Sequence, residues 1–218
     1  MMKGRRTVRG WGFLLALGIL VILIAAERDR TELAGIALVT GCGLDWAQEE
    51  EALELTVELA HKPQNDSPGE SRVFTVTGEN WAELQENLGR VLDKKIYWYN
   101  AVLLTVGTDL LELDAGRDLL RRLYQDPLFS GELLLVATED SVPQVFSATY
   151  GENTYISSGL EQGLRLEAKE QDRRPITLLD YTERVLALEE DLALPVVGVR
   201  SAGEKQEAYL REESYFVR

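Results

Sequence analysis

The stretch "TGENWAELQENLGRVLDKKIYWYNAVLLTVG", residues 77–107, contains the change of pattern that decides the fold. Its first part opens with a threonine, a glycine and an acidic residue, and then places Trp81, Leu84 and Leu88 at helical spacing, which predicts a helix. Its last part, "WYNAVLLTVG" (98–107), is apolar on both faces, as a central strand covered by helices would be. A helix followed by a buried strand predicts a sheet with helices packed against it.

The segments on either side continue this alternation of strands and helices. The nearly apolar residues 33–42 and the alternating "ALELTVELA" (52–60) predict two paired strands, and "RVFTVTG" (72–78) predicts a third. The segments after residue 107 predict helices and further strands: helices at 114–127, 158–171 and 177–192, and strands at 131–139, 194–199 and 207–218. The sequence therefore predicts an α/β (α+β) fold, a mixed β-sheet with helices packed on it.

The N-terminal segment has the pattern of a membrane anchor. Four basic residues lie within the first nine positions, and the uncharged run "GWGFLLALGILVILIAA" (10–26) is just long enough to span a bilayer as a helix. A cleaved signal peptide is the alternative, but no convincing A-x-A cleavage site follows the run. We predict a cytoplasmic basic tail and one N-terminal transmembrane signal anchor at 1–27, an extracytoplasmic domain at 28–200, and a C-terminal strand or tail at 201–218.

The charge of the chain limits its partners. Its 218 residues carry a formal net charge of −14, which argues against a nucleic-acid-binding surface. The chain has one cysteine, so it cannot form an intrachain disulfide. Stability outside the cytoplasm must then come from packing.

Cys42 invites a catalytic interpretation, because it lies between Gly41 and Gly43 at the end of a predicted strand. A catalytic thiol needs a base, and the only histidine, His61, follows the next predicted strand beside a loop with no evident third group to orient it. Lipidation is disfavoured because Cys42 lies well beyond the apolar run. We interpret Cys42 as a small buried side chain.

The acidic residues near the third predicted helix invite a metal-site interpretation. Asp109, Glu112, Asp114 and Asp118 are close in sequence, but their spacing does not match an EF-hand loop, and a solvated helix start is the simpler interpretation. The glycines near Gly41 form no phosphate-binding fingerprint. The sequence therefore predicts no catalytic residue, no cofactor and no metal.

Several segments resemble one protein family. "RDRTELAGIALVTGCGLD" (28–45) resembles the opening of the Ger(x)C family, the C subunits of spore germinant receptors, in which a strand ends in a G-x-G-x-D pattern, here Gly41, Gly43 and Asp45. Residues 77–107, "LYQDPLFSGELLLVA" (123–137) and "ALPVVGV" (193–199) are similar to later segments of the family's first domain. The resemblance covers nearly all of the chain after the apolar run.

The resemblance implies a non-enzymatic component of a spore germinant receptor at the cell or spore inner membrane, and the apolar run predicts that a single-pass helix anchors it. Its partners would be the A-type and B-type membrane subunits, and its role nutrient-triggered germination. Two departures matter: the family's lipobox cysteine is missing after the apolar run, and the chain stops at Arg218 before the family's second domain. We therefore expect an anchored first domain.

The alternative is an unrelated extracytoplasmic ligand-binding module or hydrolase, anchored to the membrane, that uses His61 or the acidic helix start.

The aromatic group "IYWYN" (96–100) is the most conspicuous candidate for contact with a partner. Its side chains could pack in the core at the entrance of a strand or bind another protein. If they bind a partner, Tyr97 and Tyr99 are the candidate contact residues.

Overall fold

The computed structural model describes residues 35–60, 71–203 and 205–217. The predicted transmembrane helix at 10–26 and His61 lie outside the described residues. Within these three ranges, no helix is both long and apolar enough to cross a membrane.

The described strands form one mixed sheet. They are β1 (Ile36–Ala47), β2 (Ala52–Ala60), β3 (Ser71–Gly78), β4 (Lys95–Tyr97), β5 (Leu103–Gly107), β6 (Leu134–Thr138), β7 (Leu192–Ala202) and β8 (Lys205–Val217). Their order across the sheet is β3-β2-β1-β5-β6-β7-β8, and β4 pairs with β1. The four central strands β1, β5, β6 and β7 are parallel, while β2, β3 and β8 continue the sheet in antiparallel pairs. The predicted mixed sheet is confirmed.

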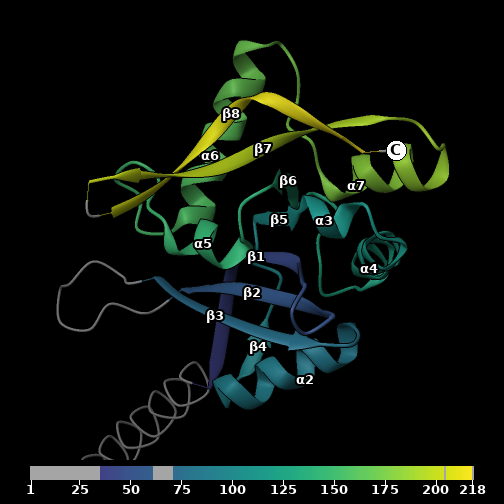
Figure 1. The fold of residues 1–218 in the computed structure, drawn as a ribbon, viewed down its shortest axis with the longest axis vertical. Coiled ribbons are helices and arrows are strands. Elements are labelled where there is room, and N and C mark those ends of the chain that lie inside the picture. The colour runs from purple at the N-terminus through teal and green to yellow at the C-terminus, as the bar shows by residue number, and fades with distance from the viewer. Residues whose placement is uncertain (1–34, 61–70, 204, 218) are drawn as a thin grey trace, which may run out of the picture. The chain divides into compact units, whose positions relative to one another are not determined.

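Helices cover both faces of the sheet. They are α2 (Trp81–Leu92), α3 (Thr108–Leu111), α4 (Asp114–Gln125), α5 (Val142–Ser147), α6 (Ile156–Glu170), α7 (Leu178–Tyr181) and the π-helix η1 (Thr182–Ala187). In Figure 1, α5 and α6 lie to the left of the parallel strands, and α4 and α7 lie to the right.

The apolar core is divided between these two faces. In β5, Leu104 packs in the cluster that contains residues of α2, α4 and α7, and Leu103 packs in the cluster that contains residues of α5 and α6. Side chains alternate between the faces of a strand, so an uninterrupted apolar run can fill two cores at once. This explains why residues 103–107 are all buried.

Local signals account for the ends of α2. Asn80 is its N-cap, and the Asn80 side chain accepts hydrogen bonds from the N–H groups of Ala82 (3.1 Å) and Glu83 (3.2 Å). Asp93 ends the helix in the left-handed conformation, with φ of 47°.

The predicted helix at 177–192 is wrong in length and type. The structure has the short α7, then the π-helix η1, which ends at Ala187. Glu189 has a positive φ of 54°, and Leu192 already pairs with Val217 in the sheet. The apolar residues near 192 therefore belong to the strand β7, which the sequence predicted only from residue 194.

Candidate functional site

The G-x-G-x-D pattern of β1 lies against the helices α5 and α6. A Cβ atom on Gly41 would be 2.5 Å from Ser157 Cβ, and a Cβ atom on Gly43 would overlap Val142 Cγ1. The backbone N–H of Val142, at the start of α5, donates to Asp45 Oδ2 at 3.1 Å. The two glycines allow the helices to approach the strand, and the aspartate binds the first turn of one of them.

Glu58 of β2 is the centre of a second polar cluster on the same face, and it is fully buried. Its Oε1 accepts hydrogen bonds from the N–H of Ile156 and the hydroxyl of Ser71, both at 2.8 Å. Its Oε2 accepts from the Thr40 hydroxyl at 2.9 Å, from the N–H of Ser157 at 3.2 Å and from the Ser157 hydroxyl. All five hydrogen bonds hold the Glu58 side chain between the sheet and the start of α6.

The Glu58 carboxylate replaces a missing helix cap. The N-cap residue of α6 is Tyr155, whose side chain makes no capping hydrogen bond. The carboxylate of Glu58 satisfies the first N–H groups of the helix and lies at the positive end of its dipole. Sequence reasoning missed this role, because Glu58 and Ser157 are 99 residues apart. We interpret the cluster as structural.

Cys42 lies on the opposite face of β1 from Gly41 and Gly43 and is 1% exposed. Burial raises its pKa to about 12, so the thiolate needed for catalysis is disfavoured. The interpretation of Cys42 as a small buried side chain is confirmed.

The thiol of Cys42 should therefore be unreactive in the folded protein. With a pKa of about 12, roughly one thiol in ten thousand is ionised at about pH 8, and the group is also covered. A thiol-specific alkylating reagent should label the denatured chain fully and the native chain hardly at all. Cys42→Ala should lower the free energy of unfolding by only about 1 kcal/mol. Rapid labelling of the native protein would contradict this.

The acidic residues near α3 and α4 bind protein groups. Asp109 accepts a hydrogen bond from Gln48 Nε2 at 2.7 Å, and Glu112 accepts one from the Tyr215 hydroxyl at 3.1 Å. Burial, followed by this bond to Glu112, raises the pKa of Tyr215 to about 12. Burial also raises the pKa of Asp45, although two backbone N–H groups that bind it act in the opposite direction.

The other two residues of the acidic segment lie apart from this group. Asp114 begins α4, and Asp118 forms an exposed ion pair with Arg121 at 2.8 Å. In the part of the chain that the structure describes, no group of His, Cys, Asp and Glu side chains could hold a metal ion.

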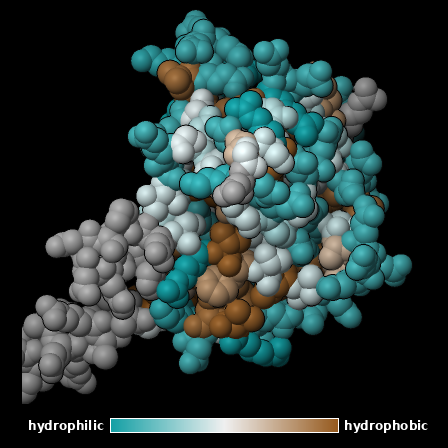
Figure 2. Space-filling view, turned by 60° about the vertical axis from the view of Figure 1, so that its left-hand side comes forward, coloured by the Kyte–Doolittle hydropathy of each residue, from teal (hydrophilic) through white to brown (hydrophobic). Residues whose placement is uncertain are grey.

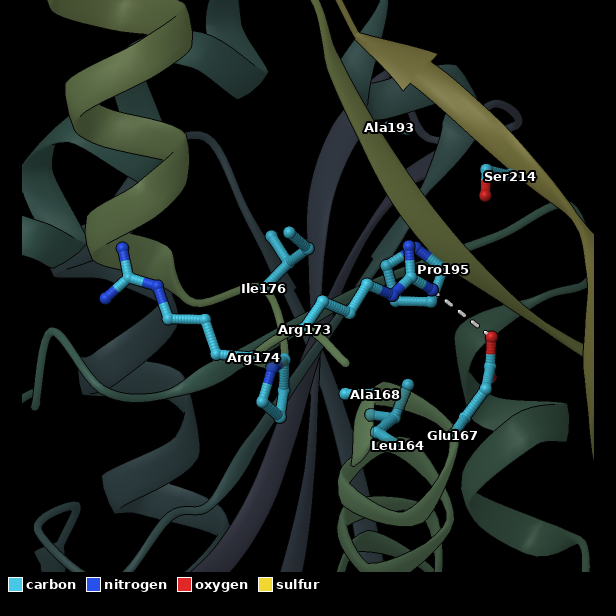
Figure 3. A pocket seen from close by; sticks show the side chains of 10 residues that line it. Leu164, Glu167, Ala168, Arg173, Arg174, Ile176, Ala193, Pro195 and Ser214 are labelled. Atoms are coloured by element: carbon cyan, nitrogen blue, oxygen red, sulfur yellow. Dashed lines mark hydrogen bonds and ion pairs between the residues drawn. The ribbon is translucent and has the colours of Figure 1, made fainter. Parts of the chain in front are cut away.

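One cavity lies between α6 and β7 (Figure 3). Leu164, Ile176 and Pro195 are among its lining residues, and Arg173 forms an ion pair with Glu167 at 3.3 Å beside it. Its volume is about 20 Å³. This is room for about one water molecule, so the cavity is too small for a substrate.

A wider groove of about 360 Å³ lies between the start of α2 and α4. Leu53, Trp81 and Leu119 line it with apolar surface, and Asp118 and Arg122 are among its polar residues. Its volume is within the range of small-molecule sites, but the described residues place no pair of nucleophile and base in it.

The aromatic group at 96–100 divides between the core and the surface. Trp98 is 3% exposed and packs against Trp81 and Phe129, with ring centroids 5.6 and 5.0 Å apart. Tyr97 and Tyr99, on either side of it, are 44% and 69% exposed, and their own ring centroids are 6.4 Å apart. The buried Trp98 thus holds two neighbouring tyrosines at the surface. In the view of Figure 2, the surface is mostly hydrophilic, with one apolar area in its lower part.

Comparison with protein families decides where the chain belongs. Residues 29–199 match the model of the spore germination protein N-terminal domain, which is well over half of the chain. The chain belongs to this family. No significant match was found among curated proteins or among solved structures.

The family match confirms the resemblance to the Ger(x)C N-terminal domain. The spore germination domain begins just before β1 and includes the G-x-G-x-D pattern, the buried Trp98 and most of β7. In this member of the family, Gly41, Gly43 and Asp45 position helices. The strand β8 lies beyond the matched residues and pairs with β7 in the same sheet.

Proposed function

We propose that this chain is a membrane-anchored, non-enzymatic component of a spore germinant receptor. It would act in nutrient-triggered germination by assembling with the A-type and B-type membrane subunits. The observation that carries the proposal is the family match over residues 29–199. The anchor is the uncharged run at 10–26, which follows a basic segment and places the domain outside the cytoplasm.

The polar clusters support a binding role over catalysis. Glu58 and Asp45 are bound to the first turns of α6 and α5, and Asp109 and Glu112 accept hydrogen bonds from side chains of the same chain. The alternative, an anchored hydrolase or ligand-binding module, relied on the acidic helix start or on His61. Of the acidic residues, Asp109 and Glu112 are bound to groups of the same chain and Asp118 is paired with Arg121, while His61 lies outside the described residues.

Tyr97 and Tyr99 are the proposed contact with a membrane subunit. Tyrosine is enriched at interfaces, where a large ring is buried at low cost in side-chain entropy. Both tyrosines are exposed next to a rigid aromatic cluster, so the surface they form exists before a partner binds.

The double variant Tyr97→Ala/Tyr99→Ala should lose its partner and keep its fold. Membranes from sporulating cells, washed with carbonate, should retain both the unmutated and the variant chain. After solubilisation, we expect co-purification of an A-type or B-type subunit to fall about tenfold or more, because two interface anchors are removed. Tyr124→Ala is the matched control, because Tyr124 is another exposed tyrosine (38%) but lies on α4.

Three outcomes would contradict parts of the proposal. Release of the unmutated chain by carbonate would refute the anchor. A double variant that melts at a much lower temperature would show that the tyrosines stabilise the fold. If no subunit co-purifies with the unmutated chain, the assembly itself is wrong.

A further inference from the structure

Two adjacent lysines lie beside the exposed tyrosines. Lys94 lies between α2 and β4, Lys95 is the first residue of β4, and both are exposed. Among the described residues, neither forms an ion pair, whereas the nearby Arg90 is paired with Glu86 at 2.5 Å. The chain has a net charge of −14, and one acidic residue, Asp93, directly precedes the two lysines.

The fold places these lysines at the end of the domain where the chain arrives from the apolar run. The strand β4 pairs with β1, and β1 begins at Ile36 (Figure 1). Residues 27–35 separate β1 from the end of the apolar run at Ala26. Even when fully extended, a segment of this length reaches only about 30 Å. If the run spans a membrane, a segment of this length allows the start of β1, and β4 beside it, to reach the membrane surface.

The internally bonded carboxylates of the parallel strands lie at the opposite end. Asp45 is nine residues along β1 from Ile36, which corresponds to about 30 Å of strand. Asp109 and Glu112 follow the carboxyl end of β5, and Asp109 lies near Asp45. Within the described domain, this acidic group and the lysine pair thus lie towards opposite ends of β1.

We propose that Lys94 and Lys95 bind the phosphate groups of anionic lipids at the membrane surface. The proposal rests on the membrane attachment proposed above. Each lysine close to an anionic bilayer strengthens binding to that bilayer about fivefold. The amphipathic rings of Tyr97 and Tyr99 are also of the kind found at membrane–water interfaces. Contact through the lysines would orient the domain so that the tyrosines meet a subunit embedded in the same membrane.

The test measures how well lipids protect these lysines. The full chain is reconstituted in vesicles of phosphatidylcholine, with or without phosphatidylglycerol, and acylated with a membrane-impermeant lysine reagent. Mass spectrometry then gives the labelling rate of each lysine. We expect phosphatidylglycerol to slow labelling of Lys94 and Lys95 about fivefold or more. Lys169, exposed in the last turn of α6, is the internal control and should label equally in both vesicles.

Each other outcome overturns the inference in a recognisable way. If the chain floats with both kinds of vesicle and Lys94 is labelled at the same rate in both, the lipid contact is refuted and the anchor is not. If phosphatidylglycerol slows the labelling of Lys169 as much as that of Lys94 and Lys95, the slowing is a general effect of the anionic surface and the specific contact is refuted. Protection by inorganic phosphate in neutral vesicles would indicate a phosphate site and no lipid contact. A chain that floats with neither vesicle would refute the attachment and the inference together.

Discussion

Glu58→Ala should lower the free energy of unfolding by about 3–5 kcal/mol, because each buried donor that loses its acceptor costs about 1–3 kcal/mol. The substitution leaves the buried N–H groups of Ile156 and Ser157 without their acceptor, and it also removes the acceptor of the half-buried Ser71 hydroxyl. It also leaves a cavity where the side chain was. Urea unfolding of the full chain in mild detergent, followed by circular dichroism, measures the loss.

Glu54→Ala is the matched control for this experiment. Glu54 lies on the same strand and the same face, but it is only half-buried, and burial together with the charges of Asp45 and Glu50 raises its pKa. Its removal relieves repulsion, so we expect a change within about 0.5 kcal/mol. If Glu58→Ala were as mild as Glu54→Ala, the carboxylate would not hold α6 to the sheet.

Gly43→Ala should destabilise the protein by about 3 kcal/mol, because the strand and α5 have no room for a methyl group. The new Cβ would overlap Val142 Cγ1 and would lie 3.0 Å from Phe146 Cε2 and 3.1 Å from the backbone oxygen of Thr105. The backbone oxygen belongs to the paired strand β5 and cannot move aside alone. Overpacking of this kind costs about 1–3 kcal/mol, and more where the surroundings are rigid.

The substitution of alanine for Gly89 should change the free energy of unfolding in the opposite direction. Gly89 lies within α2, and a Cβ atom there would meet no atom within 4 Å. Alanine favours a helix interior over glycine by about 0.5–1 kcal/mol, so Gly89→Ala should stabilise the protein. The urea midpoints of the two variants should therefore move in opposite directions. A neutral Gly43→Ala would mean that α5 does not pack on this part of β1.

Local pattern was sufficient to predict the sheet and its longer helices. The alternation in 52–60 corresponds to β2, and the helical spacing after Trp81 corresponds to α2. Of the strand predicted at 98–107, only residues 103–107 form β5. These periods follow from the geometry of a strand or helix alone, so they can be read without knowing what each element packs against. The elements β4, α3 and α5 have three to six residues, too few for a period to show, and none was predicted.

By itself, the sequence determined the class of fold, the family through the segments around G-x-G-x-D and 77–107, and an acidic surface unsuited to nucleic acid. Only the tertiary structure decided which polar and aromatic side chains are buried. In the segment 52–60, Glu58 occupies one of the polar positions that alternate with leucine and valine, a pattern that predicts a solvent-facing residue. It is nevertheless fully buried, because α6 packs over it. Trp98 is buried between two exposed tyrosines because Trp81 and Phe129 lie over it. Burial depends on elements that are distant in sequence, and no local period contains that information.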